Sequence, residues 1–146
     1  MLKIDFPSPS FKTKTKENKA YIFDEVRKKW VYLTPEEWVR QNIIAYLLAK
    51  LEYPVSLLAI EKVIAVNNLK RRCDIVVYSN NVPWMIIECK EPETPLNEKV
   101  LTQILNYNIS LQVRYLIISN GKYTWGWKIE NNKAEMINNF PLYSEC

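Results

Sequence analysis

The sequence contains no histidine. This absence excludes hydrolases built on Ser-His-Asp or Cys-His pairs, and it excludes the zinc enzymes and nucleases that depend on histidine. The two glycines, Gly121 and Gly126, are too few for a glycine-rich loop that cradles phosphate. Any catalysis by this chain would therefore rest on carboxylates, lysine, tyrosine or a hard metal ion.

Cysteines and long apolar runs are also scarce. Cys73, Cys89 and Cys146 show no C-x-x-C spacing, and two of them fall in predicted strands, which favours buried reduced thiols over a zinc site or disulfides. No apolar run approaches the roughly 18 residues of a membrane-spanning helix, and the first residues lack the apolar core of a signal peptide. We therefore expect a cytoplasmic protein with no membrane partner.

The excess positive charge lies near the N-terminus. Residues 1–33 hold eight Lys or Arg against four Asp or Glu, whereas residues 34–146 hold twelve of each. Residues 1–20 read as an extended lead-in whose first dozen residues can dock on the domain, and residues 21–146 read as one domain. The basic segment fits either an arm that faces nucleic acid or a solvated extension.

Hydrophobic periodicity and turn residues predict an ordered series of elements. The series is a hairpin (21–24 and 29–33), a helix (34–52), three strands (57–66, 74–78 and 84–90), a helix (96–110), a strand (113–119) and a second hairpin (123–129 and 134–137). A helix between the third and fourth core strands implies a crossover connection. The prediction is therefore an α/β fold with a mixed central sheet flanked by helices, in which the first hairpin covers an edge of the main sheet.

The first helix has a strong start signal. Thr34 suits the N-cap, Pro35 suits the first helical position, and Glu37 suits the last position of a capping box. Arg40 and Gln41 follow Glu37 by three and four residues, so all three share one helix face. Glu37 is then either only a cap, with Arg40 as its surface partner, or part of a functional face.

The segment Arg71–Lys90, RRCDIVVYSNNVPWMIIECK, carries the most informative charges. Side chains alternate along a strand, so Glu88 and Lys90 point the same way, roughly 7 Å apart. If the two strands pair antiparallel across the Asn80-Asn81 turn, Asp74 lies close to Glu88. Two carboxylates and one lysine then meet at a single place.

This combination suits hydrolysis of a phosphodiester bond. Carboxylates are hard ligands for Mg²⁺ or Mn²⁺, which lowers the pKa of a bound water, and Lys90 can orient that water or stabilise charge in the transition state. The simpler alternative is a salt bridge at the strand ends without catalytic consequence. The neighbouring cluster Lys70, Arg71 and Arg72 fits either a solvated strand end or phosphate contact. Glu61, a lone charge in an apolar strand, fits a salt bridge better than a metal ligand.

Several stretches together resemble the PD-(D/E)xK nuclease superfamily, and more closely the N-terminal nuclease domain of type I restriction enzyme R subunits. They are LTPEEWVRQNIIAYLL, the strand residue Glu61, RRCDIVVY, WMIIECK, QILNY and LIISNG, within residues 21–125. The resemblance implies a restriction-endonuclease-like core with the order αβββαβ, here with an added hairpin at each end. Cys73 stands where the motif has proline.

The resemblance also assigns roles to individual residues. It implies that Asp74, Glu88 and Lys90 are catalytic and that the carboxylates hold the metal. Gln103 and Tyr107 match the Q-x-x-x-Y helix motif, which supports the active site and contacts DNA. Glu37 takes the place of the first-helix acidic residue that assists metal binding, and Arg40 joins the basic cluster as a candidate DNA contact.

The expected function is a Mg²⁺-dependent or Mn²⁺-dependent DNA nuclease, working alone, as a homodimer or with a partner subunit. The alternative is a non-catalytic nucleic-acid-binding or assembly module. The basic N-terminal segment and the aromatic C-terminal hairpin (Tyr123, Trp125, Trp127) motivate it, since aromatic rings stack on bases. Those aromatic residues equally fit ordinary cross-strand packing.

Overall fold

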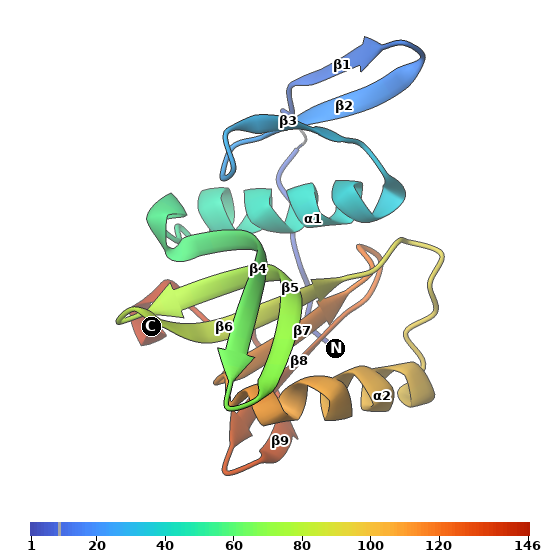
Figure 1. Ribbon diagram of the computed structural model, residues 1–146. Helices are drawn as coiled ribbons and strands as arrows, with labels where there is room; N and C mark the ends of the chain where they lie inside the picture. The colour runs from blue at the N-terminus through green and yellow to red at the C-terminus, as the bar shows by residue number, and fades with distance from the viewer. Residues whose placement is uncertain (9) are drawn as a thin grey trace.

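The computed structural model describes residues 1–8 and 10–146, so Pro9 of the predicted lead-in lies outside the described residues. The chain forms two sheets and two α-helices (Figure 1). The helices are α1 (Pro35–Ala45) and α2 (Glu98–Asn108). The small sheet contains β1 (Thr13–Lys16), β2 (Lys19–Asp24) and β3 (Lys29–Tyr32). The main sheet contains β4 (Leu58–Val66), β5 (Leu69–Ser79), β6 (Val82–Cys89), β7 (Tyr115–Ser119), β8 (Thr124–Glu130) and β9 (Lys133–Met136).

The main sheet is mixed, as the sequence predicts. Its strand order is β4-β5-β6-β7-β8-β9, and the β6–β7 pair is parallel while the other pairs are antiparallel. α2 connects the two parallel strands, which is the crossover connection that parallel neighbours require. The predicted helix 96–110 begins two residues later than expected, and its last residues form a 3₁₀ turn, Ile109–Leu111.

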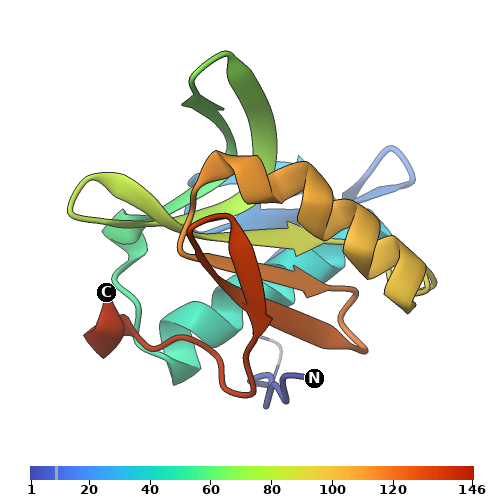
Figure 2. The ribbon, with the colours of Figure 1, turned by 90° about the horizontal axis from the view of Figure 1, so that it is seen from below.

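Each face of the main sheet is covered by one helix (Figures 1 and 2). On the α1 face, Ile43, Leu47 and Ile87 belong to one apolar core. On the α2 face, Leu101, Ile86 and Ile118 belong to a second core. Because β6 is buried on both faces, it reads as a continuous apolar run, and Glu88 near its end is the exception to that run.

The first helix starts as predicted but changes geometry earlier than expected. Thr34 accepts a hydrogen bond from the Glu37 amide at 3.0 Å, which confirms the N-cap. The α-helix ends at Ala45 and continues as one wider turn, Tyr46–Lys50, in which the Leu51 amide donates to the Tyr46 carbonyl five residues back. Wide turns of this kind are not visible in a hydrophobic pattern.

The N-terminal sheet corrects two expectations. Residues 13–16, predicted as part of the lead-in, form β1, so the hairpin is a three-stranded sheet. The sheet does not cover an edge of the main sheet; it lies on the outer side of α1 (Figure 1). Asp24 and Ile22 on β2 are fully buried, and Gln41 on α1 donates to Asp24 at 2.9 Å. α1 is therefore enclosed between the two sheets.

The N-terminal residues and the aromatic C-terminal hairpin both contribute to packing around the main sheet. Leu2 forms a bridge with Thr124 and is buried, which confirms that the first residues dock on the domain. Trp125 and Trp127 of β8 pack in the α2-side core, as cross-strand packing predicts, while Tyr123 is exposed. No helix among the described residues is long and apolar enough to cross a membrane.

Candidate active site

Strands β5 and β6 bring Asp74 and Glu88 together. Asn80 and Asn81 both adopt left-handed backbone conformations, with φ of 51° and 65°, as a tight hairpin turn requires. The strands pair through Ile75 and Ile87, and Asp74 and Glu88 stand one residue further along each strand. Asp74 also accepts a hydrogen bond from the Cys89 amide at 2.7 Å, which fixes its carboxylate beside the end of β6.

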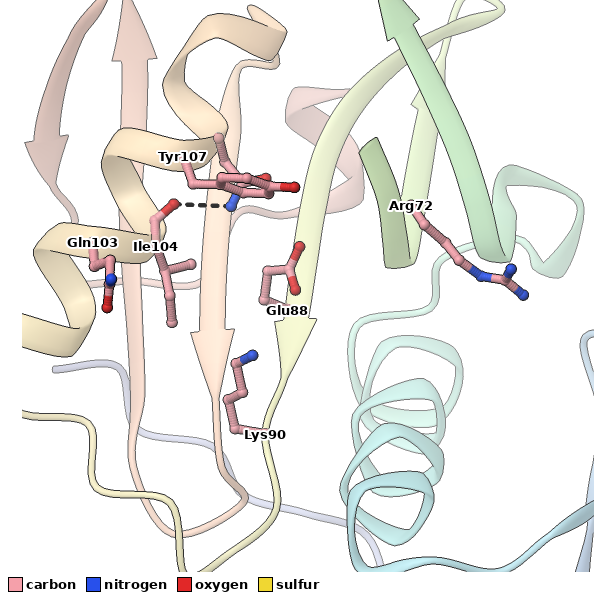
Figure 3. A pocket seen from close by; sticks show the side chains of 7 residues that line it. Arg72, Glu88, Lys90, Gln103, Ile104 and Tyr107 are labelled. Carbon is pink, nitrogen blue, oxygen red and sulfur yellow. Dashed lines mark hydrogen bonds between the residues drawn. The ribbon is translucent and has the colours of Figure 1, made fainter. Parts of the chain in front are cut away.

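Lys90 joins Glu88 in one cleft between β6 and α2 (Figure 3). The Lys90 amide donates to the Ser119 carbonyl at 2.8 Å, so the chain stays strand-like beyond β6 and Lys90 projects from the same side as Glu88. The cleft has a volume of about 350 Å³, and α2 supplies its other wall. The lining residues are Arg72, Glu88, Lys90, Gln103, Ile104, Tyr107 and Asn108.

The electrostatics of the cleft centre on Glu88. Burial, the largest cause, and the neighbouring Asp74 carboxylate together raise the pKa of Glu88 to about 7, and Lys90 opposes the shift. Near pH 7 about half of the Glu88 side chains therefore carry a proton. A cation bound between the two carboxylates would favour the ionised form.

A third acidic residue, Glu36, belongs to this group and is missed by the sequence reasoning. Partial burial and the Asp74 carboxylate raise the pKa of Glu36, while Arg40 and Lys90 lower it. The first turn of α1 therefore brings a carboxylate within electrostatic range of Asp74 and Lys90. The only signal in the sequence was the adjacent pair Glu36-Glu37 at the helix start.

Glu37 is placed differently from the expectation. Its carboxylate accepts from Arg27 at 3.0 Å, from Arg40 at 3.0 Å and from Gln41 at 3.2 Å. The Glu37 carboxylate therefore does not accept from the N-cap amide, as the predicted capping box requires, because it accepts from these three side chains instead. Adjacent residues on a helix point about 100° apart, so Glu36 and Glu37 face different partners.

Arg40 lies inside the protein rather than on a DNA-facing surface. It is 5% exposed and forms ion pairs with Glu37, Glu61 and Asp74. Its Nη1 lies 3.7 Å from Asp74 Oδ1 and has no hydrogen-bond partner among the described residues. This placement suits a residue that holds Asp74, whereas a phosphate contact requires an accessible guanidinium.

Glu61 is salt-bridged, as the sequence favours. It pairs with Arg72 at 2.9 Å, with Arg40 at 3.4 Å and with Arg27 at 3.6 Å. Its φ of 51° lies in the left-handed region, which is costly for a residue with a side chain. This conformation falls where β4 passes Asp74, between the pairs Ile60–Ile75 and Lys62–Cys73.

The three residues of the basic cluster, Lys70, Arg71 and Arg72, lie differently with respect to the cleft. Arg72 lines the cleft, but its guanidinium turns away from Glu88 toward Glu61 (Figure 3). The Arg71 guanidinium stacks over the Tyr107 ring at 3.8 Å, and Tyr107 is 57% exposed. Lys70 is exposed near the end of the β4–β5 hairpin, which extends beyond the rest of the sheet (Figure 2).

The donors present fit a magnesium ion better than a metal with an all-protein cage. Among the described residues, no group of three or more His, Cys, Asp or Glu side chains is arranged to hold a metal ion. Mg²⁺ commonly takes one or two carboxylates and completes its shell with water and substrate phosphates. Asp74 and Glu88 are the two carboxylates that could hold such an ion, and the raised pKa of Glu88 reflects its burial beside the Asp74 carboxylate.

The fold and site define an α/β domain with paired carboxylates and a lysine at the end of central strands. Residues 35–141 match the family described as the type I restriction enzyme R protein N terminus. The chain belongs to this family, as its resemblance implies. The match begins at α1 and so excludes the three-stranded sheet. No curated protein and no solved structure matches the chain.

Proposed function

We propose that this chain is a Mg²⁺-dependent or Mn²⁺-dependent nuclease that hydrolyses phosphodiester bonds in DNA and uses a restriction-endonuclease-like core. Membership of the restriction-enzyme family suggests a nuclease-related domain. The observation that carries the proposal is the cleft in which Glu88 and Lys90 face α2, with Asp74 beside Glu88.

Asp74 and Glu88 would hold the metal ion, with Glu36 at the margin of the site. A bound divalent ion supplies Lewis acidity, activates water and neutralises charge on the phosphoryl group. Lys90 is a compact positive charge next to Glu88 and stabilises the developing negative charge of the same group. Arg40 forms a buried ion pair with Asp74 and would not touch the substrate, so it is a positioning residue.

The α2 wall would position the substrate. Gln103 and Tyr107 lie one helical turn apart and both line the cleft. The Arg71 guanidinium stacked on Tyr107 is held at the rim, where it can contact a phosphate next to the scissile one. Arg72 becomes a phosphate contact only if it leaves Glu61, whereas Lys70 is already exposed.

The direct test is a cleavage assay with linear, circular and single-stranded DNA in Mg²⁺, Mn²⁺ or EDTA. Lys90→Ala should lower cleavage by about 100-fold or more, because removing one preorganised charge from a transition state commonly costs that much. Lys133→Ala, at an exposed position on β9, is the matched control and should cleave as wild type does. If wild type and Lys90→Ala behave alike on every substrate, the isolated chain is not a nuclease.

A non-catalytic nucleic-acid-binding or assembly module is the second candidate, favoured by the basic three-stranded sheet outside the family match. Calorimetric titration with Mg²⁺ separates the two, because a pure binding module has no need of the metal. Binding that disappears in Asp74→Asn supports the nuclease. A partner subunit or second copy that supplies targeting is compatible with either.

A further inference from the structure

The outer face of the three-stranded sheet is both basic and aromatic. Antiparallel partners share a face, so the pairs Lys14–Tyr21, Tyr21–Tyr32 and Phe23–Trp30 define one side. Residues two positions apart on each strand belong to the same side. The members of this surface, here called the outer face, are Lys12, Lys14, Lys16, Lys19, Tyr21, Phe23, Trp30 and Tyr32.

The opposite face of the same sheet is a conventional packing surface. Ile22 and Asp24 alternate with Tyr21 and Phe23, and both are fully buried toward α1. One face of the sheet therefore already provides its packing against the protein interior. Its aromatic residues on the other face are not explained by packing against the domain.

The outer face is accessible and ordered. Trp30 is 38% exposed and Tyr32 is 55% exposed. The rings hold each other in edge-to-face pairs, with centroid distances of 5.4 Å for Phe23–Trp30 and 6.0 Å for Tyr21–Tyr32. These contacts fix the ring orientations before any partner arrives.

The lysines lie among the rings. The Lys14 ammonium is 4.4 Å from the centre of the Trp30 ring, and the Lys12 ammonium is 5.8 Å from that of Phe23. Lys16 and Lys19 are register partners at the end of the hairpin. Positive charge and exposed ring surface thus alternate over one face.

We propose that the outer face binds single-stranded DNA. Lysines pair with backbone phosphates, and aromatic rings stack on bases that are free of a complementary strand. A duplex keeps its bases stacked inside, so it could use only the lysines of this face. The proposal does not depend on cleavage, because binding is measured without metal and the sheet lies outside the family match.

The test is fluorescence anisotropy of the full chain in EDTA with three labelled probes of about 12 nucleotides, a length within the range of single-strand sites. The probes are oligo-dT, an abasic strand of the same length and a duplex. Oligo-dT should bind at least 10-fold more tightly than either of the others, because only its bases are both present and free to stack on the aromatic rings. Equal binding of the abasic strand overturns the proposal.

Matched variants locate the binding surface. Lys14→Gln, Lys16→Gln and Lys19→Gln together should lower the slope of log affinity against log salt by about 2, since each phosphate contact on a single strand contributes about 0.7. The control triple variant, Lys3→Gln, Lys128→Gln and Lys133→Gln, removes the same charge elsewhere and should leave the slope unchanged. If the two triple variants lose affinity equally, the surface is wrongly assigned.

Tyr32→Ala separates stacking from charge. The side chain is on an exposed strand position, so thermal unfolding should show little change. Affinity for oligo-dT should fall about 5-fold or more, while affinity for the abasic strand stays constant. A proportional loss on both probes contradicts stacking. Preferred binding to anionic vesicles over oligo-dT would instead identify a membrane-facing surface and overturn the proposal.

Discussion

Replacing Glu88 with glutamine should stabilise the metal-free protein at high pH. The folded protein holds the pKa of Glu88 at about 7, compared with an ordinary value of 4.5, because the site buries this carboxyl beside Asp74. Ionisation therefore works against folding. The penalty is absent below pH 4.5, grows as the pH rises from 4.5 to 7, and is constant above 7.

The magnitude follows from the size of the shift. A difference of about 2.5 pH units corresponds to roughly 3 kcal/mol, and solvent access through the cleft reduces it to about 2 kcal/mol. Glu88→Gln should raise the free energy of unfolding by that amount at pH 8 and by less than about 1 kcal/mol at pH 5. The neutral amide also retains a side chain that can hydrogen-bond to Asp74.

Urea unfolding of wild type and Glu88→Gln in EDTA, at pH 5 and at pH 8, measures the difference in the free energy of unfolding at each pH. Glu135→Gln, at an exposed position on β9, is the control and should show no such dependence. Saturating Mg²⁺ should stabilise wild type more than Glu88→Gln, because the variant loses one of the two carboxylates proposed to hold the ion. If the effect of Glu88→Gln is destabilising, or is the same at pH 5 and pH 8, Glu88 does not carry unfavourable charge in the folded protein.

Three further outcomes follow from the same site. The Mg²⁺ affinity of wild type, measured by calorimetry, should rise about tenfold from pH 6 to pH 8. With a pKa of about 7, the deprotonated fraction of Glu88 rises from about one tenth to about nine tenths over this range, and the ion binds the deprotonated form. Arg40→Met should lower the free energy of unfolding by about 3 kcal/mol, because the buried Glu37 carboxylate loses its partner. The control Arg114→Met breaks an exposed ion pair with Glu130 and should lower it by less than about 1 kcal/mol. Equal losses of the two variants in urea unfolding would refute the buried network. Glu36→Gln should weaken Mg²⁺ binding severalfold with little change in melting temperature, because Glu36 lies near Asp74. Glu37→Gln should chiefly lower the melting temperature, because Glu37 accepts hydrogen bonds from Arg27 and Arg40. The reverse result would identify Glu37 as the metal-assisting residue.

Local patterns were sufficient for much of the fold and for the centre of the site. The period of two in a strand places Glu88 and Lys90 on one side, and the Asn80-Asn81 turn brings Asp74 back to them. The long apolar segment after α2 identified the strand that pairs parallel to β6. These features depend on residues near one another in sequence, so they are readable without a structure.

The remaining placements depended on how distant elements pack. Whether Glu36 or Glu37 faces the site is set by the rotation of α1 between two sheets, which pairs Glu37 with Arg27 from the β2–β3 turn. Arg40 is buried for the same reason. β1 went unrecognised because its side chains are exposed and carry no apolar period.

The sequence by itself limited the chemistry that can be proposed for this protein, since the absence of histidine and the D…E-x-K spacing leave carboxylates and a lysine as the candidate reactive groups. It also determined the family, to which residues 35–141 belong. Only the tertiary structure decided which charges neighbour those groups and which faces stay open. Electrostatic energy and burial depend on distances between groups in space, and those distances are fixed by the packing of α1 against both sheets rather than by spacing along the chain.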